Sequence, residues 1–328
     1  MARLSIFLVA AVLIAGMIGC APAPIEIRDW YDLHAVRNNL SGSYILMNNI
    51  DSSTRGYAEL ASETANGGRG WEPIGTSEDQ FTGRFNGQGY EIRDLFMNRP
   101  DQDYVGLFTH ISWTRYIDNV GVVENLGLTN ARVTGRAQVG TLVGHNEGLV
   151  TNCYSSGTVT GDERVGGLVG WNQATLTNSY SSCRVTGNSR VGGLVGDNWY
   201  ERGIINNTYS TGTVTGEESV GGLVGVNYYG NIGNSYSIGS VGGAKQVGGL
   251  VGWNKGAITE CFWDILTSGI SVSDGGTGKV TTEMMKITTF TGAAWNITAV
   301  APNSTDPTSI WNIVDKQTYP FLSWQSVS

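Results

Sequence analysis

The sequence predicts an all-β fold: a right-handed parallel β-helix (β-solenoid) of about eight coils, with a short helical cap at each end. Three observations predict it. One short string recurs at nearly constant spacing, two further segments recur in register with it, and glycine (47 of 328 residues) is about twice as abundant as usual. A period of this size indicates one supersecondary unit stacked on copies of itself, because a single unit cannot bury its own apolar residues.

The recurring string has the pattern Val-Gly-Gly-Leu-Val-Gly-x-Asn. Its copies span residues 139–146, 165–172, 191–198, 220–227 and 247–254, and their starts lie 26, 26, 29 and 27 residues apart. Strict alternation does not say which face of this string is the interior, so a bend or bulge at a glycine is expected. We expect one residue of each copy to stack in a column with a spacing of about 4.8 Å. These residues are Leu142, Leu168, Leu194, Leu223 and Leu250.

Two other segments recur between the copies. The first carries an Asn two residues before an aromatic residue, and the second is a Val/Thr run between small residues. Each unit therefore contains three short strands joined by tight turns, with no room for a crossover helix. The Asn column has two interpretations: a ladder of side-chain amides, or turn residues chosen for their backbone conformation. Its members are Asn152, Asn178, Asn207 and Asn234.

The string resembles the GLUG motif, which occurs in tandem in bacterial and archaeal surface proteins, adhesin-like proteins and regions attached to some peptidases. Residues 81–95 and 104–109 are similar to the stretch that leads into GLUG arrays, so a degenerate first copy begins at Tyr104. A longer gap then implies an inserted loop, 112–120, whose Trp113 and Tyr116 are expected near the surface. The resemblance implies a β-helix of the cell surface and carries over no catalytic residues.

The ends of the chain indicate export and capping. Residues 1–19 are typical of a lipoprotein signal peptide, and Met17-Ile-Gly-Cys20 resembles a lipobox, so Cys20 is the expected lipidation site and membrane anchor. Residues 20–43 are expected to form a tether and an N-terminal cap with a short helix after Asp29, 44–262 the β-helix, and 263–328 the C-terminal cap. A helical turn near Thr281 or Thr282 and five bulky residues are expected to seal the last coil: Trp295, Trp311, Tyr319, Phe321 and Trp324.

Composition and cysteine spacing narrow the function classes. Only 15% of residues are charged and the net charge is −8, which argues against nucleic acid as a partner. The column argument places Cys153, Cys183 and Cys261 out of disulfide reach, as free and buried thiols. The expected location is the cell surface or the outer face of a membrane, with secretion as the alternative.

Residues for catalysis or cofactor binding do not gather in the sequence. His34, His110 and His145 are read as lying in different columns, so no metal site, cofactor or catalytic triad is expected. The acidic residues are mainly in turns, and the Asp162 turn has a weak calcium site as its functional alternative.

Aromatic residues near one register are the better functional signal, because rings on a low-charge surface suit sugars or a protein partner; the alternative is packing over turns. The candidate binding residues are Trp171, Trp199, Tyr200, Tyr228, Tyr229 and Trp253. The predicted function is non-enzymatic adhesion or binding of glycan or matrix. The alternatives are a β-helix polysaccharide lyase or glycoside hydrolase, and a structural spacer.

Overall fold

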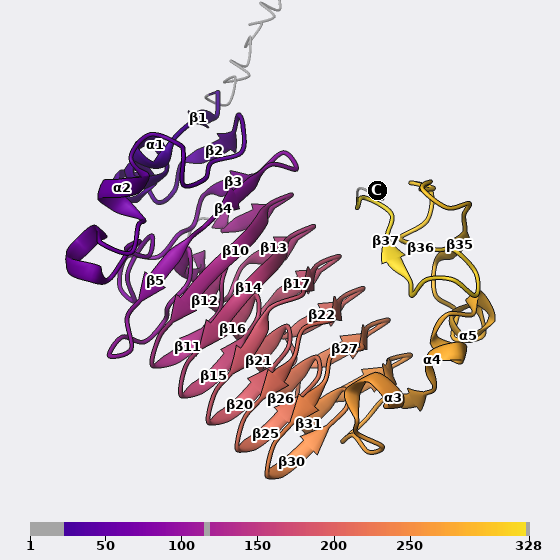
Figure 1. The fold of residues 1–328 in the computed structure, drawn as a ribbon. Helices are drawn as coiled ribbons and strands as arrows, with labels where there is room; N and C mark the ends of the chain where they lie inside the picture. The colour runs from indigo at the N-terminus through magenta and orange to yellow at the C-terminus, as the bar shows by residue number, and fades with distance from the viewer. Residues whose placement is uncertain (1–22, 115–118, 326–328) are drawn as a thin grey trace, which may run out of the picture.

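The computed structural model describes residues 23–114 and 119–325, which form a parallel β-solenoid with a C-terminal segment beside it (Figure 1). The signal peptide, Cys20 and Tyr116 lie outside the described residues, as does the side chain of Trp113. Short strands stack from coil to coil in four sheets, and every pairing within these sheets is parallel. The predicted fold class is confirmed.

Each sheet collects one segment of every coil. Sheet A contains β1 (Ile25–Ile27), β2 (Ser43–Leu46), β3 (Arg84–Asn86), β9 (Val122–Glu124), β13 (Leu149–Thr151), β17 (Thr175–Thr177), β22 (Ile204–Asn206), β27 (Asn231–Gly233) and β32 (Ala257–Thr259). Sheet C contains β6 (Phe108–Ile111), β12 (Val143–Asn146), β16 (Val169–Asn172), β21 (Val195–Trp199), β26 (Val224–Tyr228) and β31 (Val251–Asn254). Sheet D contains β11 (Ala137–Val139), β15 (Glu163–Gly166), β20 (Ser189–Gly192), β25 (Glu218–Gly221) and β30 (Lys245–Gly248).

Sheet B is the least regular of the four, because two long strands are replaced by pairs of short ones in later coils. It contains β4 (Glu91–Arg93), β5 (Phe96–Asn98), β10 (Gly127–Thr134), β14 (Tyr154–Thr160), β18 (Tyr180–Ser181), β19 (Arg184–Thr186), β23 (Tyr209–Ser210), β24 (Val214–Thr215), β28 (Tyr236–Ser237), β29 (Val241–Gly242), β33 (Phe262–Asp264) and β34 (Thr277–Lys279).

The remaining elements lie at the ends of the solenoid or project from it. They are α1 (Trp30–Ala35), the 3₁₀ turns η1 (Val36–Asn38) and η2 (Ala65–Gly68), α2 (Tyr57–Leu60), the pair β7 (Trp113–Thr114) and β8 (Asn119–Val120), α3 (Ile265–Ser268), α4 (Thr281–Met284), α5 (Ile287–Thr291), β35 (Ile297–Ala299), β36 (Trp311–Ile313) and β37 (Phe321–Leu322).

Five coils contribute a strand to all four sheets, so the expected count of about eight regular coils was too high. Upstream of Val139 the coils are interrupted by α2, η2 and the excursion at β7 and β8, and sheet D is continued only by a bridge from Val105 to Val139. Sheet A nevertheless starts earlier than residue 44, because β1 pairs with β2 in parallel.

The repeated string bends in its middle, as expected. The strand of sheet D ends at Gly166 and the strand of sheet C begins at Val169, so Val165, Leu168 and Val169 all reach the core and are fully buried. Leu168 donates its N–H to the Leu194 carbonyl at 3.0 Å, and the other leucines are joined in the same way. The predicted leucine column is confirmed.

A ladder of amides exists, but in a different column from the one considered. The Asn that ends each string donates its Nδ2 to the Oδ1 of the next, with all four distances at 2.8 Å. Its members are Asn146, Asn172, Asn198, Asn227 and Asn254. The other column, Asn152, Asn178, Asn207 and Asn234, has φ between 44° and 53°, where asparagine is favoured, so its members are chiefly turn residues.

The expected short helix after Asp29 is present, and the C-terminal cap differs from expectation. Asp29 caps α1 by accepting hydrogen bonds from the N–H groups of Tyr31 and Asp32. The last coil is closed by residues 272–274, where Ser273 Oγ accepts from the N–H of Val251 at 2.9 Å. This segment occupies the open edge that would otherwise pair with another molecule.

The C-terminal aromatic residues turn back along the solenoid instead of sealing its end. Trp311 packs against Tyr209 and Tyr236, and the Trp324 indole donates to the Asn178 carbonyl at 3.2 Å. The reason is the outer face of sheet B, where tyrosine rings from successive coils stack 4.7–5.1 Å apart. This apolar column needs a cover along its length, which a plug at the last coil would not provide.

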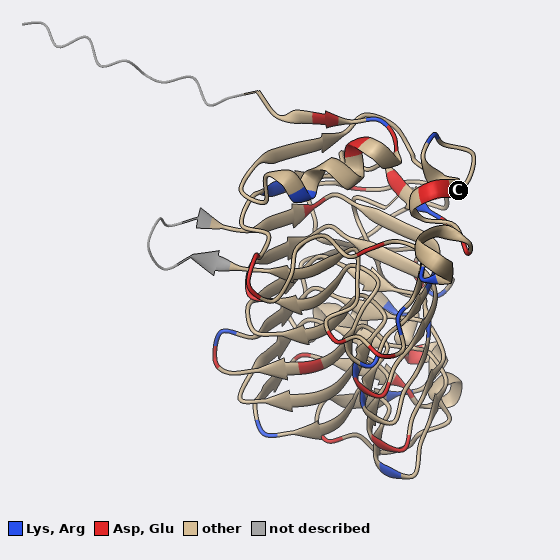
Figure 2. Ribbon diagram, turned by 90° about the vertical axis from the view of Figure 1, so that its left-hand side faces the viewer, with Lys and Arg blue, Asp and Glu red and all other residues tan. Residues whose placement is uncertain are grey.

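The thiols follow the prediction from the column argument. Cys153, Cys183 and Cys261 are free and buried, and burial raises the pKa of Cys153 and Cys261 to about 12. Acidic and basic residues are interspersed along the coils (Figure 2). At the Asp162 turn, the carboxylate accepts a hydrogen bond from Asn188 Nδ2 of the next coil at 3.1 Å.

Candidate functional site

The six predicted aromatic residues form one continuous band across sheet C and the turns that follow it. We call this band, Trp171, Trp199, Tyr200, Tyr228, Tyr229 and Trp253, the aromatic ridge. Trp199 and Tyr228 are register partners on neighbouring strands, with ring centroids 4.8 Å apart. The rings of Tyr228 and Trp253 are nearly parallel at 6.0 Å, and Trp171 meets Trp199 edge-on at 5.9 Å. The ridge therefore runs along the solenoid axis, from coil to coil.

Two tyrosines project most strongly from the ridge. Tyr200 is 53% exposed and Tyr229 is 42% exposed, whereas the other four side chains are half-buried. Both tyrosines have positive φ, 63° and 60°. This conformation costs a non-glycine residue about 1–2 kcal/mol, and two successive coils adopt it at matching turns. A tyrosine at each of these turns therefore carries a conformational cost that a glycine would avoid.

A pocket lies on each side of the ridge. The first, about 500 Å³, is lined by Trp199, Tyr228 and Trp253 together with Arg190 and Glu218. The second, about 1150 Å³, contains Tyr200 and Tyr229 together with Glu147, Gln173 and Arg202. Within the described residues, the indole N–H groups of Trp171 and Trp199 find no protein hydrogen-bond partner. The ridge therefore combines aromatic surface with the polar and charged side chains that line the two pockets, which is the mixture that orients a polar ligand.

A buried carboxylate supports the base of the ridge. Asp197 is fully buried in the same column as Trp171, and its Oδ2 lies 3.2 Å from Arg164 Nε and 3.1 Å from Arg190 Nη1. Arg164 also lies over the Trp171 ring at 5.3 Å. Burial raises the pKa of Asp197 to about 6, against the lowering effect of the two arginines. Its second oxygen has no partner within the described chain.

Asp197 predicts a pH dependence of stability. Because its pKa is higher in the folded chain than in the unfolded chain, the folded chain binds the proton more tightly, and the free energy of unfolding falls as pH rises from about 4 to about 6. The full effect is about 3 kcal/mol. Asp197→Asn should flatten the profile over this window in denaturant titrations, whereas Asp162→Asn, at an exposed turn, should keep the parent slope. Equal slopes in parent and Asp197→Asn would contradict the assignment.

Two histidines continue the ridge toward the N-terminal coils, which corrects the expectation that no two histidines share a column. His110 and His145 are register partners, their ring centroids lie 4.2 Å apart, and His145 stacks on Trp171 at 4.1 Å. The degenerate copy that begins at Tyr104 already places His110 six residues after its start, as His145 lies six residues after Val139, although the excursion at β7 and β8 lengthens the spacing between them. Aligning Phe108-Thr109-His110 with Val143-Gly144-His145 was the available signal.

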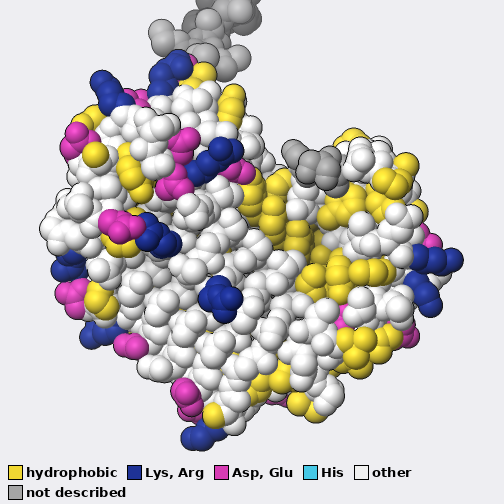
Figure 3. All heavy atoms as spheres, viewed as in Figure 1, with side chains coloured by type: hydrophobic (Ala, Val, Ile, Leu, Met, Phe, Trp, Pro, Cys, Tyr) yellow, Lys and Arg dark blue, Asp and Glu magenta, His cyan; other side chains and the backbone are white. Residues whose placement is uncertain are grey.

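A third hollow, separate from the two pockets beside the ridge, opens between the solenoid and the C-terminal segment (Figure 3), and we call it the C-terminal hollow. The sequence reasoning missed it. It measures about 840 Å³ and is lined by Tyr154, Tyr180 and Trp324 beside the amides of Asn125 and Asn152. Only the backward course of the C-terminal segment creates it. No local pattern in the sequence indicated that residues 324 and 154 would meet.

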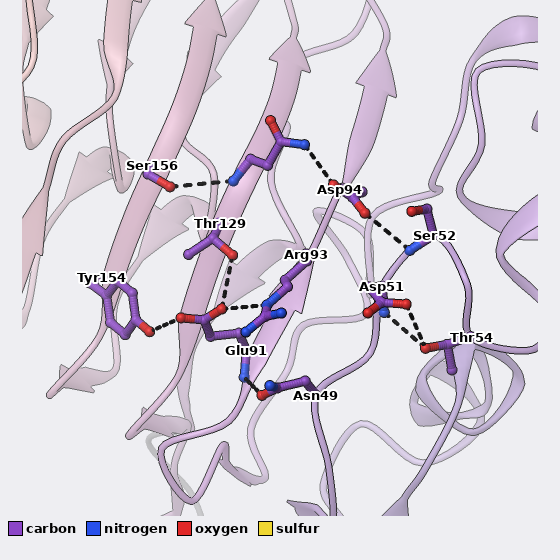
Figure 4. A network of polar contacts seen from close by, with 11 residues as sticks. Asn49, Asp51, Ser52, Thr54, Glu91, Arg93, Asp94, Thr129, Tyr154 and Ser156 are labelled. Carbon is purple, nitrogen blue, oxygen red and sulfur yellow. Dashed lines mark hydrogen bonds and ion pairs between the residues drawn. The ribbon is translucent and has the colours of Figure 1, made fainter. Parts of the chain in front are cut away.

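The polar wall of this hollow is a closed network (Figure 4). Glu91 accepts hydrogen bonds from the Tyr154 hydroxyl, from Thr129 Oγ1 at 3.1 Å and from Arg93 Nε at 2.6 Å. The pKa of Glu91 is lowered because these hydrogen bonds outweigh its burial. A carboxylate engaged by three partners is suited to holding the wall in place.

Two segments of the chain, 135–160 and 187–215, match the family model described as the GLUG motif. The solenoid carries the GLUG motif. The matched segments fall within the regular coils that also carry the aromatic ridge, so the resemblance on the repeated string is confirmed.

Relatives of the GLUG coils cover part of the chain. Halomucin of Haloquadratum walsbyi is 35% identical over 144 residues, which is 43% of this chain and 2% of halomucin. A protein of Evansella cellulosilytica, provisionally named a Gly-rich membrane protein, is 39% identical over 141 residues, which is 42% of this chain and 15% of that protein. The chain thus spans a small fraction of the length of both relatives.

A solved structure shares the fold over nearly the whole chain. It comes from Bacteroides ovatus, is provisionally named an immunoglobulin A1 protease, and has a TM-score of 0.61 with 19% identity, covering 92% of this chain and 93% of that one. At this identity the likeness concerns the fold alone. Of the helices in the described ranges, none has the length and apolar character needed to cross a membrane.

Proposed function

We propose that this chain is a surface-anchored, non-catalytic module that binds an extended glycan along the aromatic ridge. The observation that carries the proposal is the continuity of the ridge: its rings pass from coil to coil along the solenoid axis, with a pocket on either side. A linear polymer laid along this axis would meet an aromatic contact at successive coils. Aromatic faces contribute about 0.5–1.5 kcal/mol each beyond the area they bury.

The distribution of ionisable groups supports binding over turnover. A glycoside hydrolase requires a pair of carboxylates flanking the scissile bond. Beside the ridge, Glu163 is paired with Arg164 and Arg190, and Asp197 is buried between the same arginines. Glu91 in the C-terminal hollow is likewise engaged, by Arg93 and Tyr154. Glu163 and Asp197 therefore stabilise the fold around the ridge, and Glu91 stabilises the wall of the C-terminal hollow.

Surface anchoring completes the proposal and rests on the sequence. Cys20 would carry the lipid and hold the solenoid at the outer face of a membrane. One relative of the GLUG coils is named a membrane protein, which agrees with an outward location. The adhesive partner would be a glycan of a neighbouring cell or matrix.

The ridge is tested by removing its two most exposed rings. A glycan array and affinity electrophoresis on soluble polysaccharides identify a bound polymer for the parent chain. Tyr200→Ala/Tyr229→Ala should then weaken binding by about tenfold, because two aromatic contacts are lost. Both side chains are exposed, so the fold should remain intact.

A matched control is available at the N-terminal cap. Tyr31 is 41% exposed, nearly the same as Tyr229 at 42%, and Tyr31→Ala should bind like the parent. Unchanged binding in the folded double variant would remove the ridge from consideration. Absence of any bound glycan would favour a structural spacer, and release of oligosaccharide by the parent would favour an enzyme.

A further inference from the structure

Three side chains with metal-ligand chemistry meet at the N-terminal end of the aromatic ridge. His110 lies on β6, His145 on the adjacent strand β12, and Glu147 directly after β12. One potential ligand atom from each lies within 4.8 Å of the others, and His110 Nε2 is 3.0 Å from Glu147 Oε2. Within the described part of the chain, no other three His, Cys, Asp or Glu side chains meet in this way.

The sheet holds the two imidazoles in place. Both residues belong to paired strands of sheet C, are 6–7% exposed, and stack on each other and on Trp171. Strand pairing and stacking therefore fix both imidazoles side by side before an ion binds, as a preorganised metal site requires.

The third group is able to move. The Glu147 side chain is 39% exposed, so its carboxylate can shift without disturbing the core. Ligands about 2.0–2.2 Å from a tetrahedral zinc lie roughly 3.3 Å apart, so drawing the three atoms together requires a displacement of about 1–1.5 Å. His110 and Glu147 already lie at about this spacing, so the displacement is the approach of their two ligand atoms and that of His145 to one another.

An entry path and an oxygen for a further position are also present. Glu147 and Gln173 both line the 1150 Å³ pocket beside the ridge, and Gln173 Oε1 lies 2.7 Å from His145 Nε2. Two cations act on the cluster: Arg164, whose charge is directed to Asp197 and Glu163, and Arg202, which lines the same pocket as Glu147. The guanidinium of Arg164 is thus already compensated.

We propose that His110, His145 and Glu147 bind one zinc ion, with the remaining coordination position open to the pocket beside the ridge. Two imidazoles and a carboxylate form a borderline-soft ligand set that favours Zn²⁺ over Ca²⁺ or Mg²⁺. With three protein ligands, the ion keeps a position for water or for an oxygen of a bound molecule. The site is independent of the glycan proposal, since it stands on the histidine pair.

The proposal is tested by zinc titration of the full chain, carried in a Cys20→Ser background with a histidine-free tag so that neither contributes ligands. Isothermal titration calorimetry with Zn²⁺ should show one bound equivalent, and Co²⁺ should give the visible absorption of a tetrahedral site. His145→Gln and Glu147→Gln should each weaken binding by at least about tenfold. His34→Gln, in the N-terminal helix α1 and outside the cluster, is the matched control and should bind like the parent.

The stack on Trp171 provides a second readout. Co²⁺ bound beside His145 should quench the fluorescence of Trp171, whose ring is 4.1 Å from the imidazole. Trp171→Phe should lose this quenching while keeping the calorimetric signal. If a histidine variant fails to fold, the exposed Glu147→Gln variant decides. Absence of zinc binding in the parent, or binding that survives Glu147→Gln unchanged, overturns the proposal.

Discussion

Replacing Gly192 with alanine is expected to lower the free energy of unfolding by at least about 3 kcal/mol. A Cβ atom at this position would lie 2.0 Å from the Val195 carbonyl oxygen, 2.7 Å from the Gly225 nitrogen and 2.9 Å from the Leu223 carbonyl oxygen. All three atoms are backbone, from the same coil and the next one, so no side chain can rotate out of the way. The strain would be relieved only by opening the corner between sheets C and D.

Thermal and urea denaturation followed by circular dichroism measure this effect, and Gly242→Ala is its control. Gly242 lies in β29, and a Cβ there meets no heavy atom within 4 Å. Because alanine also restricts the unfolded chain, the control should change stability by less than about 1 kcal/mol. Similar losses in the two variants would show that glycine is used for some reason other than close backbone approach.

Replacing Asn198 with alanine is the second large expected effect. Asn198 Nδ2 donates to Asn227 Oδ1, and its own Oδ1 accepts from Asn172 Nδ2, both at 2.8 Å in a fully buried column. The substitution leaves a donor and an acceptor unpaired away from water, at about 1–3 kcal/mol each. We therefore expect the free energy of unfolding to fall by roughly 2–6 kcal/mol.

Asn178→Gly is the control that distinguishes the role of the amide ladder from that of the column of turn asparagines. Asn178 has φ of 47°, which glycine adopts without strain, and its Oδ1 has no partner within the described residues. This variant should remain within about 1 kcal/mol of the parent in the same denaturant titrations. If Asn178→Gly destabilised the chain as strongly as Asn198→Ala, the assignment of the two Asn columns would be wrong.

Local sequence pattern predicted the structure well within the regular repeats. The spacing of the repeated string predicted parallel coils and the leucine column, because residues one period apart in a solenoid are neighbours in space. The same argument predicted that Cys153, Cys183 and Cys261 are free. It did not say which asparagine column faces inward, since that depends on the bend at Gly166 and Gly167, and alternation cannot place a bend.

The aromatic residues illustrate the same division. Their recurrence near one register predicted that Trp171, Trp199 and Tyr228 lie on one side of the solenoid, and the rings do form one band. The meeting of His110 with His145 was missed although the degenerate copy at Tyr104 puts His110 at the position of His145, on the near side of an excursion that makes the two coils unequal in length. Register across an insertion is decided by strand pairing.

The sequence by itself determined the coil, the order of its three recurring segments and the columns within regular repeats, because each of these depends on contacts between residues about 27 positions apart. Only the tertiary structure decided the course of the C-terminal segment, which covers the tyrosine column of sheet B and creates the hollow at Tyr154 and Trp324. The physical reason is that this segment has no repeat. Its position follows from apolar surface left exposed by the folded solenoid, a property of the assembled coils and of no local stretch of sequence.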